Sequence, residues 1–126
     1  MIFGIGTDIV NISRVEASLL RYEQKFATKI LAASELKCFK DHVSPAYFLA
    51  KRFAAKEAAA KALGTGFRQG LYLKHIVVVS DEYGKPTLKF MGYANTLCEK
   101  LGVGESFVSL SDEKDYAIAY VILMKK

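Results

Sequence analysis

The sequence has 126 residues, of which 52% are hydrophobic and 25% are charged. This composition excludes an intrinsically disordered chain, and the length suits a single domain over residues 1–126 built on one core. No apolar stretch approaches the roughly 20 residues that a bilayer-spanning helix needs, so no membrane partner is expected. The net charge of +5 is compatible with nucleic acid, an acidic protein or a phosphorylated small molecule.

The start of the chain and the cysteines indicate a cytoplasmic protein. Met1–Gly6 lacks a basic leader, and Asp8 follows too early for a signal peptide. Cys38 and Cys98 lie far apart without CxxC spacing, so reduced thiols are expected rather than a disulfide framework.

The first third of the chain predicts a strand and then a long helix. Met1–Gly6 is a short apolar run containing glycine, which is typical of a buried strand. Ser13 and Glu16 have the spacing of a capping box. We therefore expect a helix over residues 14–31.

Two more helices are predicted before the middle of the chain. A short one should begin at residues 34–35. Ser44 and Pro45 form a start signal for a long one, with a capping serine followed by proline at the first helical position. This helix should end at Gly64 or Gly66.

The second half predicts two hairpins separated by a helix. Its β-branched runs favour strands, and its glycines favour turns and helix ends. The expected elements are strands Leu73–Ser80 and Pro86–Phe90, a helix Gly92–Leu101, and strands Ser106–Leu110 and Tyr116–Met124. This order implies an α+β fold with a mainly antiparallel sheet covered by helices on one face.

The segment KRFAAKEAAAKALGTG, residues 51–66, combines one acid with four cations on an alanine-rich helix. Glu57 and Lys61 are four apart, which also fits a surface ion pair contributing about 0.3–0.5 kcal/mol. However, the alanines around Glu57 would let another backbone approach closely. Arg52 and Lys56 make the neighbourhood suitable for phosphate.

Asp8 follows the first predicted strand, where ligands commonly bind at the rim of a sheet. A simple turn residue is the alternative interpretation. If Asp8 and Glu57 converge, the two carboxylates near lysines would form a hard-oxygen site. Such a site suits Mg²⁺, which keeps several waters and also binds phosphate oxygens.

The predicted helix over residues 14–31 has a cationic stripe and an apolar face. The stripe consists of Arg14, Arg21, Lys25 and Lys29. The apolar face consists of Val15, Leu19, Phe26 and Ile30. A solvated cationic face is the commoner outcome, but a stripe of one sign also suits docking against an acidic helix or a phosphate backbone.

Other kinds of site have little support. His42 and His75 are isolated, which disfavours zinc sites and serine triads. A small module that binds RNA or single-stranded nucleic acid is an alternative, based on the positive charge and on seven Tyr and eight Phe. Against it, no exposed stacking series of aromatics is evident.

Several motifs together resemble one family over essentially the whole chain. They are GIGTDIV at 4–10, FLAKRFAAKEAAAKALGTG at 48–66, GKP at 84–86 and YAIAYVI at 116–122. In this combination the chain resembles the holo-acyl-carrier-protein synthases, which are small 4′-phosphopantetheinyl transferases. The resemblance implies transfer of the phosphopantetheine arm of coenzyme A to a serine of apo acyl carrier protein, with release of 3′,5′-ADP.

The resemblance also implies roles for particular residues. Asp8 and Glu57 match the family's magnesium ligands, and Lys61 matches a lysine at the phosphates. The residues that match the coenzyme site are Arg52, Phe53, Gly64 and Pro86. Arg14 matches a residue on the basic first helix that meets the acidic carrier protein. Family members are commonly homotrimers with active sites between subunits, which we expect here too.

One position departs from the family pattern. Many members have S-[LI]-[ST]-H near the last hairpin, with the histidine close to the coenzyme phosphates. This chain has the sequence SLSD at 109–112. Asp112 cannot donate to a phosphate as an imidazolium does, so it is not expected to bind the coenzyme.

Overall fold

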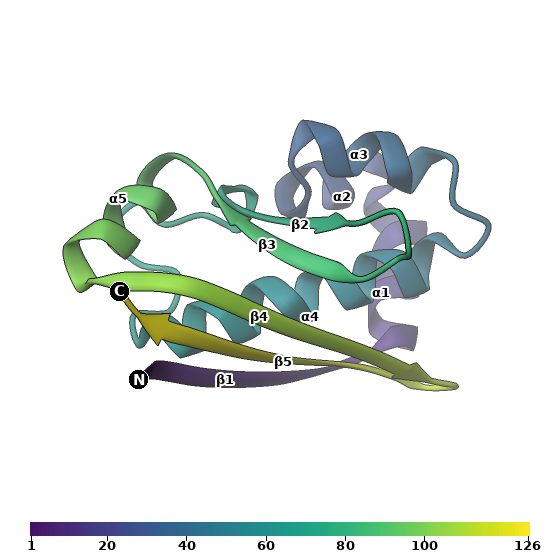
Figure 1. Ribbon diagram of the computed structural model, residues 1–126. Helices are drawn as coiled ribbons and strands as arrows, with labels where there is room; N and C mark the ends of the chain where they lie inside the picture. The colour runs from purple at the N-terminus through teal and green to yellow at the C-terminus, as the bar shows by residue number, and fades with distance from the viewer.

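The computed structural model describes residues 1–126 and contains two antiparallel sheets arranged around one long helix (Figure 1). The larger sheet has the strand order β1–β5–β4, and the smaller one pairs β2 with β3. The strands are β1 (Ile2–Asn11), β2 (Ile76–Ser80), β3 (Pro86–Phe90), β4 (Val103–Glu113) and β5 (Tyr116–Lys125). The predicted α+β class with antiparallel pairing is confirmed, although the strands divide between two sheets.

Helix α4 (Pro45–Leu63) lies between the two sheets (Figure 1). Pro45 occupies its first turn and Gly64 ends it in the left-handed conformation, with φ +83°, as predicted. Ser44 stands at the N-cap, but its side chain makes no capping hydrogen bond. All of the alanines of α4 are buried, which is consistent with neighbours on every side.

Strand β1 crosses α4 at close backbone distance. A Cβ atom at Gly4 would overlap the carbonyl oxygen of Ala62, and one at Gly6 would overlap that of Ala58. The expectation that the alanines admit another backbone is therefore confirmed, and the backbone is that of β1. The strand also continues beyond Gly6, because the β-branched residues that follow remain paired with β5.

The predicted helix over residues 14–31 is instead two helices, α1 (Ile12–Tyr22) and α2 (Gln24–Ile30). Glu23, with φ +53°, lies between them and turns the chain. The capping box was also wrong, because Asn11 is the cap and accepts from the backbone nitrogen of Ser13 at 3.0 Å. The predicted apolar residues still pack on the core, since α1 and α2 each turn an apolar side inward.

The remaining helical elements are α3 (Ala33–Lys40), the 3-10 turn η1 (Leu73–His75) and α5 (Gly92–Leu101). The short helix near residue 34 and the helix from Gly92 match prediction. The strand predicted from Leu73 begins only at Ile76, because η1 occupies its first three residues. No helix is long and apolar enough to cross a membrane.

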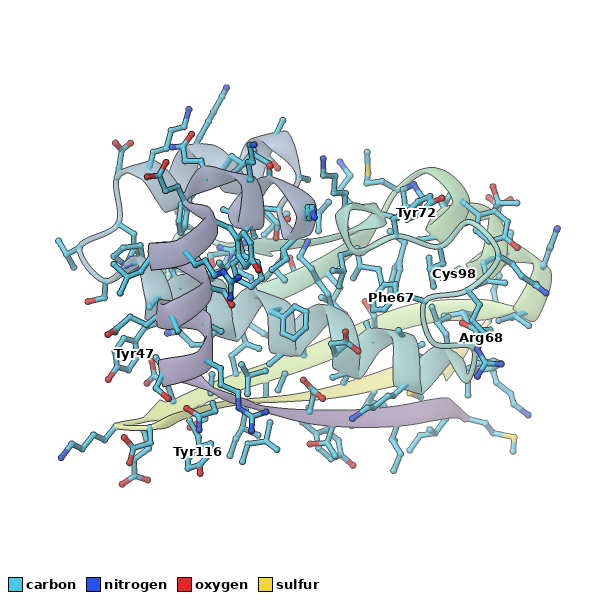
Figure 2. The ribbon with its side chains drawn as sticks, turned by 180° about the vertical axis from the view of Figure 1, so that it is seen from behind. Tyr47, Phe67, Arg68, Tyr72, Cys98 and Tyr116 are labelled. Carbon is cyan, nitrogen blue, oxygen red and sulfur yellow. The ribbon has the colours of Figure 1, made fainter.

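The two cysteines are both free, as expected. Cys38 is exposed on α3. Cys98, labelled in Figure 2, is buried on α5. Burial raises the pKa of the Cys98 thiol to about 11, so this residue has the properties of a packing side chain.

The two faces of the larger sheet differ in what covers them. One face packs against α4, and every second residue of β5 is buried there. The other face is open and apolar, and Tyr116 projects from it (Figure 2). Its exposed large apolar residues include Ile5, Ile9, Phe107, Ile118 and Tyr120.

Candidate active site

Asp8 and Glu57 line the same cleft, which we call the carboxylate cleft. It has a volume of about 300 Å³ and lies where β1 and α4 meet α1 and α2. Its other lining residues are Ile9, Val10, Asn11, Arg14, Val15, Ser18, Phe26 and Phe53. The two acids predicted to converge are therefore brought together.

Asp8 reaches this cleft by a route that the sequence interpretation did not foresee. It was expected beyond the end of a strand, but it lies inside β1, opposite Ala119 of β5. Side chains alternate between the two faces of a strand, so Asp8 shares the inner face with Gly4 and Gly6. The close approach of these glycines to α4 carries Asp8 toward Glu57.

Lys61 bonds to Asp8 rather than to Glu57. Its Nζ donates to Oδ1 of Asp8 at 3.0 Å and to the carbonyl oxygen of Thr7 at 3.0 Å. A Glu57–Lys61 ion pair, the alternative interpretation of their spacing, is not among the salt bridges of the structure. The Lys61 side chain is 54% exposed. Its ammonium group can therefore contact both Asp8 and an anion that enters from solvent.

The pKa of Glu57 is raised because the positive charge of Lys61 does not offset burial and the negative charge of Asp8. Burial raises the pKa of the Glu57 carboxyl above the ordinary value, and the negative charge of Asp8 raises it further. Lys61 opposes both effects but does not cancel them. The site therefore holds two neighbouring carboxylates, of which only Asp8 has a direct cationic partner.

These two carboxylates fit Mg²⁺ better than a metal that needs a full set of protein ligands. No group of three or more His, Cys, Asp or Glu side chains is placed so that it could hold a metal ion. Mg²⁺ is commonly bound through one or two carboxylates and completes its shell with waters and substrate phosphates. A divalent cation would also relieve the repulsion between Asp8 and Glu57.

A second cleft, the arginine cleft, lies on another side of α4. It has a volume of about 330 Å³ and contains Arg52 and Pro86, two of the predicted coenzyme ligands. Its other lining residues are His42, Phe48, Lys51, Val78, Ser80, Gly84 and Leu110. Two basic side chains therefore meet a turn-rich segment of the β2–β3 hairpin.

The predicted coenzyme residues are consequently divided. Phe53 lies in the carboxylate cleft, whereas Arg52 and Pro86 lie in the arginine cleft. Gly64 ends α4 and lines neither cleft. Within one chain, the structure does not bring this set together.

Asp112, the position that departs from the family pattern, has a clear partner. Its Oδ2 lies 3.3 Å from Nζ of Lys51, a lining residue of the arginine cleft. Both side chains are about one-third exposed. Asp112 thus contacts the cleft indirectly, through a lysine.

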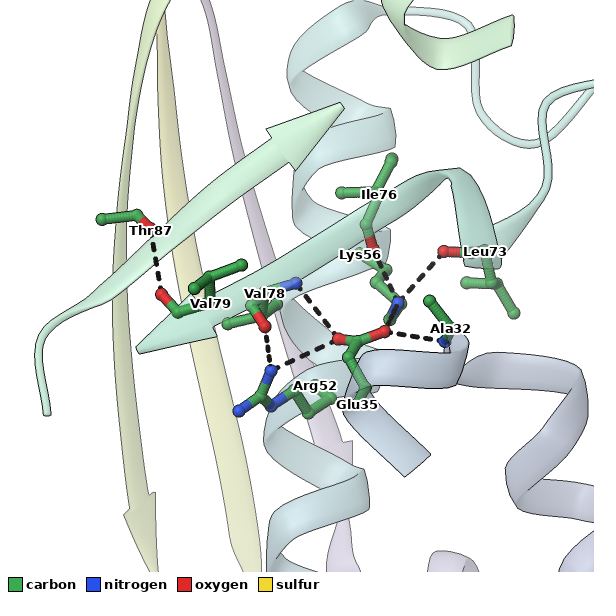
Figure 3. Close-up of polar contacts among 9 residues, drawn as sticks. All are labelled: Ala32, Glu35, Arg52, Lys56, Leu73, Ile76, Val78, Val79 and Thr87. Atoms are coloured by element: carbon green, nitrogen blue, oxygen red, sulfur yellow. Dashed lines mark hydrogen bonds and ion pairs between the residues drawn. The ribbon is translucent and has the colours of Figure 1, made fainter. Parts of the chain in front are cut away.

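Lys56 was expected to favour phosphate near the site, and this was wrong. Its side chain is fully buried, and Nζ donates to Oε1 of Glu35 at 2.6 Å. It also donates to the carbonyl oxygens of Leu73 and Ile76, at 3.1 and 2.6 Å (Figure 3). Burial lowers the pKa of Lys56, and the charge of Glu35 opposes that shift.

Glu35 is a residue that sequence reasoning missed. It is 1% exposed and joins α3 to two of the basic residues of α4, Arg52 and Lys56 (Figure 3). The available signal was Lys56 itself, a lysine on an alanine-rich helix that another backbone was expected to approach closely. A buried cation requires a buried anion, and Glu35 fills that role.

The four predicted docking residues do not form one stripe, because α1 and α2 are separate helices. Arg14 and Arg21 belong to α1, and Lys25 and Lys29 to α2. All four are exposed, and none takes part in a salt bridge. Arg14 reaches the carboxylate cleft, and Lys29 lines a further cleft that also contains Glu57.

That further cleft lies under the loop that follows α4, which the sequence interpretation left unassigned. Phe67, Arg68 and Tyr72 of this loop are labelled in Figure 2, and all three line the cleft with Glu57. Glu57 therefore lines both this cleft and the carboxylate cleft. No regular pattern in the loop sequence could have predicted this.

Comparisons with known proteins show which family the chain belongs to. A family model described as the 4′-phosphopantetheinyl transferase superfamily matches residues 4–121. The chain belongs to this superfamily. The holo-[acyl-carrier-protein] synthase of Nitrosococcus oceani is 56% identical over 124 residues, covering 98% of this chain and 80% of that protein.

Solved structures of family members have the same fold. The holo-[acyl-carrier-protein] synthase of Neisseria meningitidis has a TM-score of 0.94 at 41% identity, covering 99% of this chain and all of that one. The Bacillus anthracis holo-(acyl-carrier-protein) synthase, a complex with CoA (3′,5′-ADP), has a TM-score of 0.83 at 34% identity. That comparison covers 100% of this chain and 99% of the other. The predicted resemblance and fold are confirmed.

Proposed function

We propose that this protein transfers the 4′-phosphopantetheine group of coenzyme A to a serine of apo acyl carrier protein. The serine Oγ forms a bond to the phosphorus that carries pantetheine. The bond from that phosphorus to the bridging oxygen breaks, and 3′,5′-ADP leaves with the electron pair. The proposal makes the chain a holo-[acyl-carrier-protein] synthase that acts in fatty acid biosynthesis.

The carboxylate cleft supplies the proposed chemistry. Asp8 and Glu57 would hold Mg²⁺, which would neutralise negative charge on the diphosphate of coenzyme A. Lys61 stabilises the charge that develops on the departing phosphate, a role supported by its exposed position beside Asp8. Phosphoryl transfer depends mainly on positioning and electrostatics, so these groups suffice without a covalent intermediate on the enzyme.

Glu57, or a water that it orients, is the candidate for accepting the serine proton. A general base is most effective when its pKa lies close to the working pH. Burial and the neighbouring Asp8 raise the pKa of Glu57 in the metal-free protein. A divalent cation held by the same carboxylate would oppose that rise, which favours a water oriented by Glu57 as the acceptor when the metal is bound. Because Glu57 lines two clefts, the two substrates can approach it from different sides.

The proposed coenzyme site consists of Arg52, Phe53, Lys61, Gly64 and Pro86, and it lies between subunits of a homotrimer. Two observations support this arrangement. The predicted coenzyme residues divide between two clefts of one chain, which a second copy could complete. The outer face of the larger sheet is apolar and open, as expected of a surface that another subunit covers. Sedimentation velocity should give a trimer, and a monomer at assay concentration would exclude this arrangement.

The acyl carrier protein docks on α1 and α2. Arg14, Arg21, Lys25 and Lys29 are exposed cations without acidic partners, which would attract an acidic protein and set its register. Nucleic acid and membrane are not partners in this proposal. The protein would act in the cytoplasm as one domain over residues 1–126, with both thiols reduced.

The convergence of Asp8 and Glu57 in one cleft of a superfamily member carries the proposal. The test is to incubate the protein with coenzyme A, Mg²⁺ and apo acyl carrier protein and to measure the mass of the carrier. The carrier should gain one phosphopantetheine group, and chelation of Mg²⁺ should prevent the gain. Salt-sensitive binding of oligonucleotides with no mass gain would instead support the nucleic-acid-binding alternative.

A further inference from the structure

The guanidinium of Arg52 is hydrogen-bonded through one nitrogen and lies over the ring of Phe48, with Cζ 4.6 Å from the ring centroid, and the side chain is about one-tenth exposed. Its Nη1 donates to the carbonyl oxygen of Val78 and to Oε2 of Glu35, the latter at 3.4 Å. Its other nitrogens have no protein partner, yet no buried side-chain nitrogen or oxygen lacks one. Nε and Nη2 therefore reach solvent, and the residue lines the arginine cleft.

Glu35 organises this arrangement from behind the cleft. Its Oε2 accepts from Arg52 and from the backbone nitrogen of Val78 at 3.1 Å. Its Oε1 accepts from Lys56 at 2.6 Å and from the backbone nitrogen of Ala32 at 2.9 Å (Figure 3). One carboxylate thus ties the start of α3, two turns of α4 and the middle of β2.

The contacts of Glu35 divide into two groups. Arg52 and Val78 both line the arginine cleft, whereas Ala32 and Lys56 line none of the clefts described above. Glu35 itself is 1% exposed and cannot touch a ligand. Any influence on the cleft must pass through the two residues that it holds.

We infer that Glu35 is a positioning residue for coenzyme binding, which it supports by fixing the guanidinium of Arg52 and the β2–β3 hairpin. This inference rests on the proposed function, because it takes the arginine cleft as part of the coenzyme site. With Nη1 held, Nε and Nη2 keep one orientation toward the cleft. A preoriented guanidinium loses less freedom when it binds a phosphate, so the benefit is in coenzyme affinity rather than in the transfer step.

A direct test compares Glu35→Gln with Glu35→Asp. Glutamine keeps the size of the side chain but loses the charge, and its amide nitrogen would face a donor. Glu35→Gln should raise the KM for coenzyme A about tenfold, with little change in kcat or in the KM for the carrier protein. Glu35→Asp keeps the charge and should recover part of that loss. The dissociation constant of coenzyme A, measured by calorimetry, should follow the same order.

Leu97→Ala is the control for general loss of stability. Leu97 is a core residue of α5 that lines none of the clefts described above. It should lower the melting temperature while leaving the KM for coenzyme A unchanged.

The inference is wrong if folded Glu35→Gln binds coenzyme A as the wild type does, or if kcat and both KM values change together as stability falls. If Glu35→Gln does not fold, Glu35→Asp is compared with Leu97→Ala instead. The inference is then wrong if Glu35→Asp leaves the KM for coenzyme A unchanged, or if kcat and both KM values change together as stability falls. Failure of the wild-type protein to modify the carrier would instead refute the proposed function.

Discussion

Lys56 and Glu57 are neighbours in sequence, but α4 turns them into different environments. Lys56 is fully buried and bonded to three acceptors, whereas Glu57 is half-buried, close to a second carboxylate and part of the lining of two clefts. The comparison separates two uses of charge on one helix. A charge whose partners are all within the protein holds elements together, and a charge left undercompensated at a cleft is available for chemistry.

The strongest test of this contrast is removal of Glu57. Glu57→Ala should abolish transfer, with a loss on the order of a thousandfold or more, because the carboxylate serves metal and proton rather than packing. The melting temperature should stay close to that of the wild type. Mass spectrometry of the carrier and calorimetric melting measure the two quantities, and a folded mutant that retains magnesium-dependent transfer would contradict the assignment.

Removal of Lys56 should have the opposite signature. Lys56→Ala leaves Glu35 buried with one cation fewer and opens a cavity, so stability should fall by about 3–5 kcal/mol. Lys51→Ala is the matched control on the same helix. Its exposed pair with Asp112 should contribute about 0–1 kcal/mol. Urea unfolding of both variants measures the difference, and equal losses would remove the distinction between buried and exposed charge.

The helix boundaries differed in how well the sequence predicted them. Pro45 and Gly64 defined α4 correctly because their effects on the backbone are local. The break at Glu23 carried no such signal, because a glutamate gives no local indication that its φ will be positive.

The site was predictable in its chemistry but not in its geometry. The pairing of Asp8 with Glu57 depends on the contact of Gly4 and Gly6 with α4, a long-range contact that no spacing encodes. The burial of Lys56 was missed for a similar reason, because its partner Glu35 lies on another helix.

The carrier surface gives a smaller expected effect. Arg21→Glu or Lys25→Glu should raise the KM for acyl carrier protein by about tenfold, because each replaces an unpaired exposed cation by a repulsive charge. The KM for coenzyme A should change little. Steady-state kinetics with each substrate varied in turn would show this, and equal increases for both substrates would argue against docking on these helices.

The smallest expected effect concerns the titration of Glu57. In the folded protein its pKa is raised, so its contribution to stability falls as pH rises from the ordinary carboxyl value through the raised one. Asp8→Asn removes the repulsion by Asp8 and should lower the pKa of Glu57 while burial continues to raise it. NMR titration of the Glu57 carboxyl carbon in metal-free protein would measure the shift, and an unchanged pKa would show that the two carboxylates do not interact.

The central claim is that Asp8 and Glu57 act on one divalent cation. A crystal structure of the protein with Mg²⁺ and coenzyme A tests it most directly. We predict one ion with an oxygen of each carboxylate at about 2.0–2.1 Å and a diphosphate oxygen in the same shell. An ion bound to the diphosphate with one or both carboxylates turned away would contradict the account.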